Sequence, residues 1–294
     1  MHLCVRSHNS QCLIRISVDN NTAIGHERLS VEIWVIYLLL GALAGVLAGL
    51  LGVGGGLIIV PVLFGLFTEA GFDSALTMHM AIATSLATII VTAIASTMAH
   101  HRHQAVIWSV FWKLLPGILI GSIAGAIFAS DLPGNLLIVC FALFEIFVAW
   151  QMWFAVKPET SGSLPGAPGM FLAGGTIGSV SAIIGIGGGT LTVPFLVWCN
   201  RGVHKAVATS SACGLPIALA SAVSYLLLGL DEPNLPTRSA GYIYLPAFLS
   251  ISLMSLLFAP LGAKLAHRLP VMALKKIFAI LLILIGVKML LVVI

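Results

Sequence analysis

Long runs of this 294-residue chain contain no Asp, Glu, Lys or Arg, and this feature limits the possible folds more than any other. The runs cover residues 33–68, 74–101, 114–130, 161–200, 206–230 and 239–263. Only 8% of all residues are charged, against about 25% in soluble domains. A helix that crosses a membrane needs about 20 apolar residues. The sequence therefore predicts an all-α polytopic membrane protein with the lipid bilayer as its main partner.

The remaining composition excludes several other classes. The net charge of +4 comes mainly from the N-terminal tail and short loops, which indicates membrane topology and not a nucleic-acid partner. The five cysteines form no CxxC pair and no His/Cys cluster, so we expect no metal and no cofactor. Residues 1–30 are polar and lack the apolar core of a signal peptide, which predicts a disordered N-terminal extension.

Two copies of one glycine-proline segment show that the chain contains an internal repeat. GVGGGLIIVP at 52–61 recurs as GIGGGTLTVP at 185–194. HMAIATS at 79–85 likewise parallels HKAVATS at 204–210, and Leu115-Pro116 parallels Leu245-Pro246. Because several matches follow in the same order, we interpret the chain as a duplication.

The duplication divides the chain into two transmembrane repeats, 31–157 and 170–294, joined by a Pro-, Gly- and Ser-rich linker at 158–169. Each repeat contains five apolar segments, the second of which is short and begins at the triple glycine. In the first repeat we expect them at 33–50, 57–67, 78–99, 107–129 and 136–156. In the second we expect them at 170–184, 191–199, 206–228, 242–266 and 274–294.

The charges in equivalent loops have opposite signs in the two repeats. Glu69 and Asp73 follow the short segment of the first repeat, whereas Arg201 and Lys205 follow that of the second. Cytoplasmic loops carry an excess of Lys and Arg. The pattern predicts inverted repeats with an odd number of crossings each, and 8 to 10 crossings in total, depending on whether a glycine-centred pair is re-entrant.

The triple glycines predict a break in a helix at the same place in each repeat. Each glycine costs a helix about 1 kcal/mol relative to alanine. A break would expose backbone N–H groups at the positive end of the short helix, which is a site for an anion, and matched interruptions in two repeats are typical of transporters. The alternative is close packing of unbroken helices through small residues. The candidate binding residues of this motif are Gly52, Gly54, Gly55, Gly56, Pro61, Gly185, Gly187, Gly188, Gly189 and Pro194.

Hydroxyl side chains early in the third segment of each repeat are further candidates. Thr84 and Ser85 in the first repeat, with Thr209, Ser210 and Ser211 in the second, can donate hydrogen bonds to an anion without adding charge. Most Ser and Thr in membrane helices instead bond a backbone carbonyl or a neighbouring helix. Both interpretations stay open from the sequence.

Three titratable residues are candidates for carrying a coupling proton. His79 and His204 occupy the same position in the two repeats, and an imidazole titrates near physiological pH. Glu145 lies within an apolar segment, where a carboxylate is a functional candidate. The alternative for the histidines is an interfacial position at the start of a helix.

The two copies of GxGGGxxxxP, each followed by AxATS, resemble the sulfite exporter TauE/SafE family of bacterial membrane permeases. The likeness spans about residues 33–294. It implies transport of sulfite, sulfoacetate or a related organosulfur anion across the bacterial cytoplasmic membrane, usually as export and driven by the proton gradient. The repeats differ where Leu57 faces Thr190 and Leu86 faces Ser211, so side-chain contacts to a substrate would be asymmetric.

A secondary transporter working by alternating access is the function that we expect. An anion channel, or a permease for another small organic acid, is the nearest alternative. An enzyme is disfavoured because the sequence has no HExxH helix and no evident nucleophile with its base. A structural scaffold would leave the duplicated helix breaks unexplained. The sequence does not determine the oligomeric state.

Overall fold

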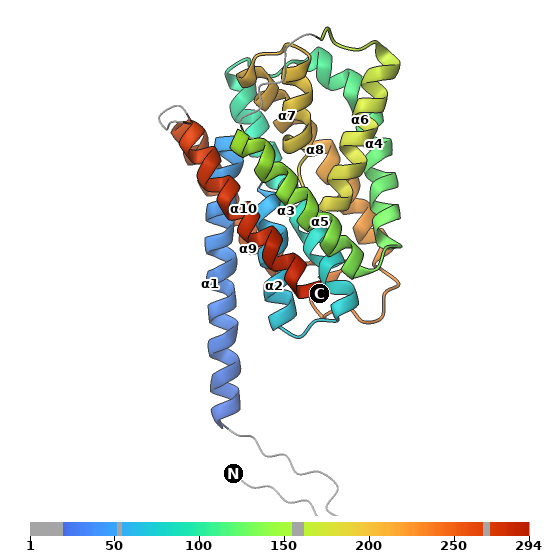
Figure 1. Ribbon diagram of the computed structural model, residues 1–294. Coiled ribbons are helices and arrows are strands. Elements are labelled where there is room, and N and C mark those ends of the chain that lie inside the picture. The colour runs from blue at the N-terminus through green and yellow to red at the C-terminus, as the bar shows by residue number, and fades with distance from the viewer. Residues whose placement is uncertain (1–19, 52–54, 155–161, 267–270, 294) are drawn as a thin grey trace, which may run out of the picture. The chain divides into compact units, whose positions relative to one another are not determined.

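The computed structural model describes residues 20–51, 55–154, 162–266 and 271–293. Residues 1–36 and 37–294 form two separate units, and the packing described below is that of the second unit. Within the described residues the chain is almost wholly helical, with ten helices and one pair of two-residue strands (Figure 1).

The helices fall into two sets of five. The first set is α1 (Asn20–Leu51), α2 (Gly56–Glu69), α3 (Ser74–Arg102), α4 (Trp108–Ser130) and α5 (Gly134–Phe154). The second set is α6 (Ala167–Ile184), α7 (Gly189–Trp198), α8 (Val203–Leu228), α9 (Leu245–Ala266) and α10 (Val271–Val293). Strands β1 (Ser239–Ala240) and β2 (Ile243–Tyr244) pair antiparallel between α8 and α9.

Each apolar segment predicted from the sequence overlaps one helix of the structure, and the all-α membrane class is confirmed. Six helices, α3 to α6, α8 and α9, are long and apolar enough to span a membrane, while 33–49 of α1, α2 and α7 are shorter apolar helices. One difference concerns the extension at 1–30. Helix α1 begins at Asn20, so residues 20–30 are helical where the sequence predicts disorder. These residues lack proline, which allows the helix to continue beyond its apolar part.

The outer faces of the helices are apolar, as contact with lipid requires. On α4 the side chains of Trp112, Ile120 and Phe128 are 58–63% exposed. Residues of the opposite face of α4, such as Leu114 and Ile118, are fully buried. This inversion of the usual soluble surface means that α4 contacts the hydrocarbon on one side and the protein interior on the other.

Glycines bring helices of different sets into backbone contact. A Cβ added to Gly121 of α4 would collide with the carbonyl oxygen of Gly175 in α6. A Cβ added to Gly262 of α9 would likewise collide with the carbonyl oxygen of Val46 in α1. Without a driving force from water, helices in lipid associate through such close packing. Helix α4 therefore packs on α6, and α9 packs on α1, across the boundary between the repeats.

These contacts match residue by residue between the repeats. Gly41 and Gly174 precede their glycine segments by the same spacing, and added Cβ atoms would meet Ile251 and Leu114, respectively. Ile251 and Leu114 in turn lie equally far from the starts of their own helices, α9 and α4. The same geometry has therefore been built twice, with each repeat supplying the partner of the other.

The matched contacts correct one detail of the repeat alignment. Leu245 and Pro246 begin α9, as Trp108 begins α4, whereas Leu115 and Pro116 lie in the second and third turns of α4. The Leu-Pro dipeptides are therefore not equivalent in the structure. The match arose because proline is tolerated at the first turn of a helix and, at a cost, within a membrane helix.

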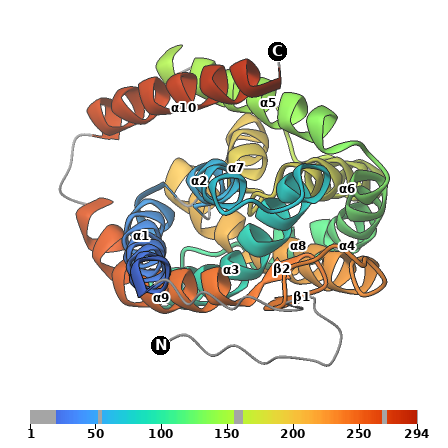
Figure 2. The same ribbon diagram turned by 90° about the horizontal axis from the view of Figure 1, so that it is seen from below.

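Helices α3 and α8, the third helices of the two sets, run antiparallel. Ser96, near the end of α3, hydrogen-bonds Ser211 near the start of α8, while Ile89 earlier in α3 packs with Ala218 later in α8. Helices α5 and α10 pair in the same way and lie side by side in both views (Figures 1 and 2). Helices α2 and α7 lie towards the middle of the bundle (Figure 2).

Candidate functional site

Helices α2 and α7 both start at a left-handed glycine inside the bundle. Gly55 precedes α2 with φ 78°, and Gly188 precedes α7 with φ 72°; neither offers a side chain to cap the helix. Residues other than glycine rarely adopt such angles. The first amides of a helix have no partner within it. The sequence-predicted residues Gly52 and Gly54 lie outside the described part of the chain.

The two glycine segments meet each other. A Cβ on Gly56 would lie 2.5 Å from the carbonyl oxygen of Gly185 and 3.0 Å from the Cα of Ile186. Ser85 donates a hydrogen bond of 2.9 Å to the same Gly185 oxygen. Gly185 ends α6 in a left-handed conformation, φ 83°. The breaks predicted separately in two repeats thus form one structure at the centre.

Both short helices contain a proline, which removes one hydrogen bond within each helix. Pro61 lies in the second turn of α2, and Pro194 in the second turn of α7. Since proline has no N–H, the carbonyls of Leu57 and Thr190, four residues earlier, lose their usual helical donor. Helix α7, with ten residues, rises only about 15 Å, about half of a hydrocarbon core. A helix of this length is too short to span the membrane by itself.

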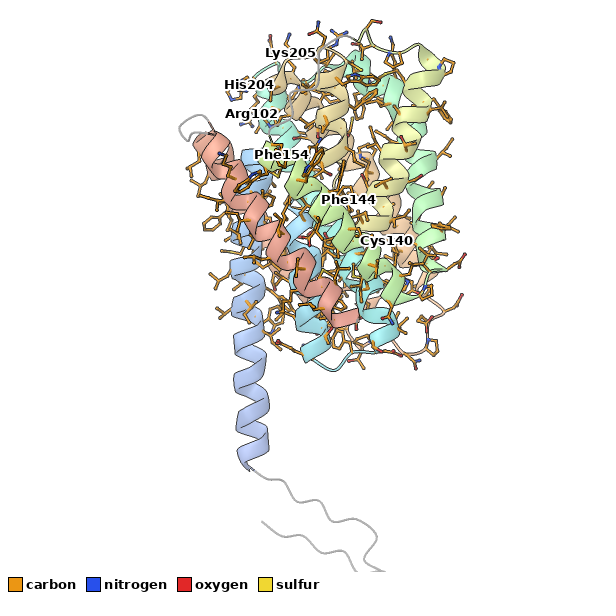
Figure 3. All side chains as sticks on the ribbon, viewed as in Figure 1. Arg102, Cys140, Phe144, Phe154, His204 and Lys205 are labelled. Carbon is orange, nitrogen blue, oxygen red and sulfur yellow. The ribbon has the colours of Figure 1, made fainter. Side chains whose placement is uncertain are left out.

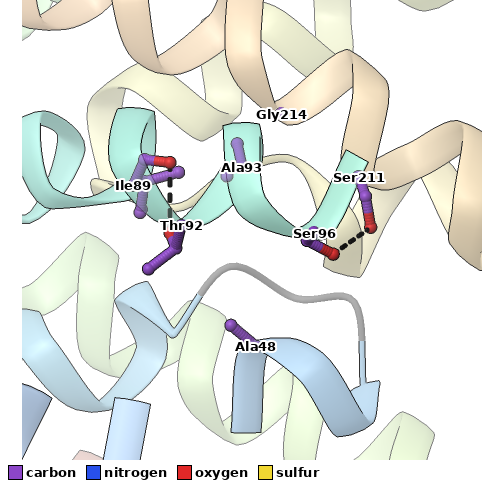
Figure 4. Close-up of a pocket in the computed structure, with 8 residues that line it drawn as sticks. Ala48, Ile89, Thr92, Ala93, Ser96, Ser211 and Gly214 are labelled. Atoms are coloured by element: carbon purple, nitrogen blue, oxygen red, sulfur yellow. Dashed lines mark hydrogen bonds between the residues drawn. The ribbon is translucent and has the colours of Figure 1, made fainter. Parts of the chain in front are cut away.

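A small cavity lies beside the second glycine segment (Figure 4). Its volume is about 10 Å³, about the space of one water molecule. The wall is made by Gly187, by α1, by one face of α3 and by the start of α8, and consists of Ala48, Ile89, Thr92, Ala93, Ser96, Gly187, Ser211 and Gly214. Of the residues predicted from the sequence, Gly187 and Ser211 line this cavity.

Two hydroxyl residues of this cavity were missed by the sequence analysis. Thr92 bonds the Ile89 carbonyl at 3.1 Å, and Ser96 donates to Ser211 at 3.2 Å. The signal was present, because Thr88, Thr92 and Ser96 recur every four residues and so share one face of α3. Thr92 and Ser96 lie beyond the repeated AxATS motif, so the comparison of the two repeats does not point to them.

Thr84 and Thr209 have a structural role in this conformation. Thr84 accepts a hydrogen bond of 3.0 Å from the Tyr244 N–H, just before α9. Thr209 accepts one of 2.9 Å from the Ile107 N–H, just before α4. The two bonds are equivalent, and each joins the third helix of one repeat to the start of the fourth helix of the other. The backbone-bonding interpretation of these threonines is therefore the one favoured by the geometry.

The remaining serine of the motif differs from its counterpart. Ser85 bonds Gly185, whereas the hydroxyl of Ser210 is fully buried and has no hydrogen-bond partner among the residues that the structure describes. An unsatisfied buried hydroxyl costs about 1–3 kcal/mol. Such a group inside a membrane protein is a candidate to contact a ligand or a water.

The two equivalent histidines lie in different environments. His79 is 4% exposed, and its ring nitrogens lie 3.2 Å from the carbonyl oxygens of Ala75 and Ala129. A neutral imidazole has one N–H, so both carbonyls can accept only when the ring is protonated. His204 is exposed at the start of α8. The structure thus separates the two candidates for a coupling proton.

Glu145 is the third candidate. It is fully buried in α5, beside Gly286 of α10, and within the described ranges neither carboxylate oxygen has a hydrogen-bond partner. An ionised carboxylate in that position would be costly, and binding a proton removes the charge. Of the three candidates, Glu145 is the one that is both deep in a membrane helix and unpaired among the described residues.

The two ends of the bundle carry charges of opposite sign. Arg102, His204 and Lys205 lie at one end (Figure 3). At the other end, burial of the phenol raises the pKa of Tyr242 above its usual value, and the negative charges of Glu232 and Asp131 raise it further. The structure therefore gathers the basic loops of both repeats on one side. By the positive-inside rule this side is expected to face the cytoplasm.

The fold and the matched interrupted helices define a multi-pass membrane transporter and not an enzyme. The profile of the family "Sulfite exporter TauE/SafE" matches residues 37–289, so the chain belongs to that family. The family resemblance stated from the paired motifs is thereby confirmed.

Three relatives from different organisms carry names of the same class. A "Probable membrane transporter protein" of Haemophilus influenzae is 36% identical over 256 residues, which are 87% of this chain and 97% of the relative. Proteins with the same description from Methanocaldococcus jannaschii and Bacillus subtilis are 26% and 27% identical, covering 77% and 67% of this chain and 81% and 79% of their own lengths. No solved structure matches the chain.

Proposed function

We propose that this transporter moves sulfite, sulfoacetate or a related organosulfur anion across the bacterial inner membrane, as a proton-coupled exporter that works by alternating access. The observation that carries the proposal is the meeting of two interrupted helices, at Gly56 and Gly185, in the middle of the bundle. Helix N-termini without side-chain caps attract an anion without a fixed cation. An anion held without a salt bridge can also be released.

The antiparallel course of equivalent helices supports the inverted repeats on which the mechanism depends. Alternating access in such folds is a rocking of one repeat against the other around a fixed midplane site. Here the contacts at Gly41 and Gly174, and those of Thr84 and Thr209, occur in equivalent pairs. Because these contacts are the same in both repeats, they can be kept in an outward and an inward state while other parts of the two repeats exchange conformations.

The substrate is tested with purified protein in liposomes. Counterflow of radiolabelled sulfite should saturate, and unlabelled sulfite and sulfoacetate should compete, whereas a neutral sugar should not. With an imposed pH gradient the anion should accumulate above its electrochemical equilibrium. Flux that only follows the gradient of the anion would indicate a channel. Competition by carboxylic acids alone would indicate a permease for another small organic acid.

Replacing Glu145 by Gln tests the coupling proton. The amide has nearly the same shape and cannot titrate, so we expect counterflow to persist within about twofold while accumulation driven by the pH gradient disappears. The matched control is Gln151→Glu in the same helix, which adds a carboxyl group at a partly exposed position. Unchanged proton-driven accumulation in Glu145→Gln would assign coupling to another group, with His79→Gln as the next variant to measure.

A further inference from the structure

We infer that the anion site is asymmetric. A singly charged oxyanion binds at the N-terminus of α7, beside the hydroxyls of Ser181 and Thr192. The equivalent N-terminus of α2 does not bind it. This inference rests on the proposed function and specifies its site. It assigns to substrate selection Ser181, which lies outside the repeated motifs, and Thr192, which lies at a variable position of the second glycine-proline motif.

The hydroxyls of Ser181 and Thr192 are buried and available to donate hydrogen bonds to a ligand. Both residues are 0% exposed, and neither hydroxyl has a hydrogen-bond partner in the described structure. They lie 3.5 Å and 3.6 Å, respectively, from the point where a Cβ of Gly188 would stand. The Cδ1 of Ile217 lies nearer still to that point, so the two unpaired hydroxyls lie on either side of this methyl group, close to Gly188 and to the first amides of α7.

One more unpaired hydroxyl lies in the same turn. Thr190, the second residue of α7, is 7% exposed and its Oγ1 also has no partner. Leaving three buried hydroxyls unsatisfied is unfavourable, because each has lost its hydrogen bonds to water without gaining others. Native structures rarely keep such a cluster without a ligand or bound water to satisfy it.

The first repeat has an apolar side chain at each of these positions. Counting from the glycine segments, Ser181 corresponds to Ala48, Thr190 to Leu57 and Thr192 to Ile59. Leu57 and Ile59 are buried in the core. The α2 N-terminus thus has the same glycine geometry as that of α7 but offers no hydroxyl to a ligand. The backbone is duplicated, and the side chains that can recognise a ligand are not.

The surroundings select the charge of the ligand. The stretches 161–200, 206–230 and 74–101, which form α6, α7, most of α8 and most of α3, contain no Lys or Arg. Amide and hydroxyl donors can replace the hydration of one negative charge, but the desolvation cost grows with the square of the charge. The side chain of Ile217 in α8 lies beside Gly188 and would give the ligand an apolar contact. A sulfonate, with one charge and an apolar substituent, fits this chemistry better than sulfate.

Three small molecules of similar size test the assignment. Methanesulfonate, sulfate and dimethyl sulfone share a tetrahedral sulfur and carry one, two and no negative charges. In counterflow of bisulfite, the singly charged form of sulfite, by the wild-type protein in liposomes, methanesulfonate should compete at least tenfold better than either of the others. Equal or better competition by sulfate would overturn the selection by charge.

Substitutions that remove each hydroxyl, and so make the position apolar as it is in the first repeat, locate the site. Ser181→Ala and Thr192→Val should each raise the half-saturating concentration of methanesulfonate by roughly tenfold, the effect of losing about 1.4 kcal/mol of hydrogen bonding. Thr192→Ser, which keeps the hydroxyl, should retain most of the wild-type affinity. Thr176→Val is the matched control, because Thr176 is an exposed residue of α6 whose hydroxyl bonds its own helix.

The outcomes separate this inference from the proposed function. Wild-type protein that transports no sulfur anion rejects the proposed function. Wild-type transport with unchanged competition in Ser181→Ala and Thr192→Val rejects only the α7 site. Loss in Thr192→Ser equal to that in Thr192→Val also rejects it, because the effect would then not depend on the hydroxyl. The purified variants are compared by gel filtration so that a folding defect is recognised.

Discussion

Replacing Gly56 by Ala should reduce anion transport at least tenfold while the protein still inserts and folds. The added methyl would lie 2.5 Å from the Gly185 carbonyl oxygen and 3.0 Å from the Cα of Ile186, and backbone atoms cannot swing aside as side chains do. Overpacking of this kind costs about 1–3 kcal/mol, and here it would separate the two glycine segments. Initial rates of sulfite counterflow in liposomes measure the effect.

Gly65 provides the control in the same helix. A Cβ at Gly65 of α2 has no neighbour within 4 Å, so Gly65→Ala should transport at the wild-type rate. Both variants replace a helical glycine by alanine, and they differ only in what the methyl group meets. Equal, wild-type activity of the two variants would contradict the view that contact between the glycine segments is required.

Replacing Gly121 by Ala should have the largest effect on stability. Its Cβ would collide with the Gly175 carbonyl of α6, and Ser179 would lose the geometry of its 2.9 Å hydrogen bond to the Gly121 carbonyl. We expect a loss of roughly 3 kcal/mol, visible as a lower midpoint of thermal unfolding in detergent and a lower yield of folded protein.

The control is the glycine on the other side of the same interface. A Cβ on Gly175 would meet only the Gly117 carbonyl oxygen at 3.9 Å, an ordinary contact. Gly175→Ala should therefore unfold at nearly the wild-type temperature. If both substitutions shifted the midpoint equally, general helix propensity and not the one-sided backbone contact would determine stability at this interface.

Much of the architecture could be predicted from the sequence because the bilayer restricts it severely. In hydrocarbon every backbone polar group must be satisfied within its own segment, so a long charge-free run becomes a helix. The helix breaks at Gly55 and Gly188 were equally accessible, since three consecutive glycines are costly in a helix. These features depend on local chemistry, which a single sequence records.

The site was predictable only in part because it depends on which helices face each other. Thr84 and Thr209 were candidate ligands by residue type, yet their hydroxyls bond the backbone before α9 and α4. Thr92 and Ser96 were not selected, although they line the cavity. Periodicity shows that residues share a helix face, but it does not show what that face packs against.

The exchange of partners between the repeats bears on the ancestry of the fold. Helix α4 packs closely on α6, and α1 packs closely on α9. A fragment of five helices would therefore leave the glycine-lined faces of α4 and α1 without a packing partner. A primordial single-repeat protein with these glycines could bury them only by pairing with a second copy of itself in the opposite orientation. Fusion of two such copies would allow their side chains to diverge at equivalent positions, as Ala48 and Ser181 have done.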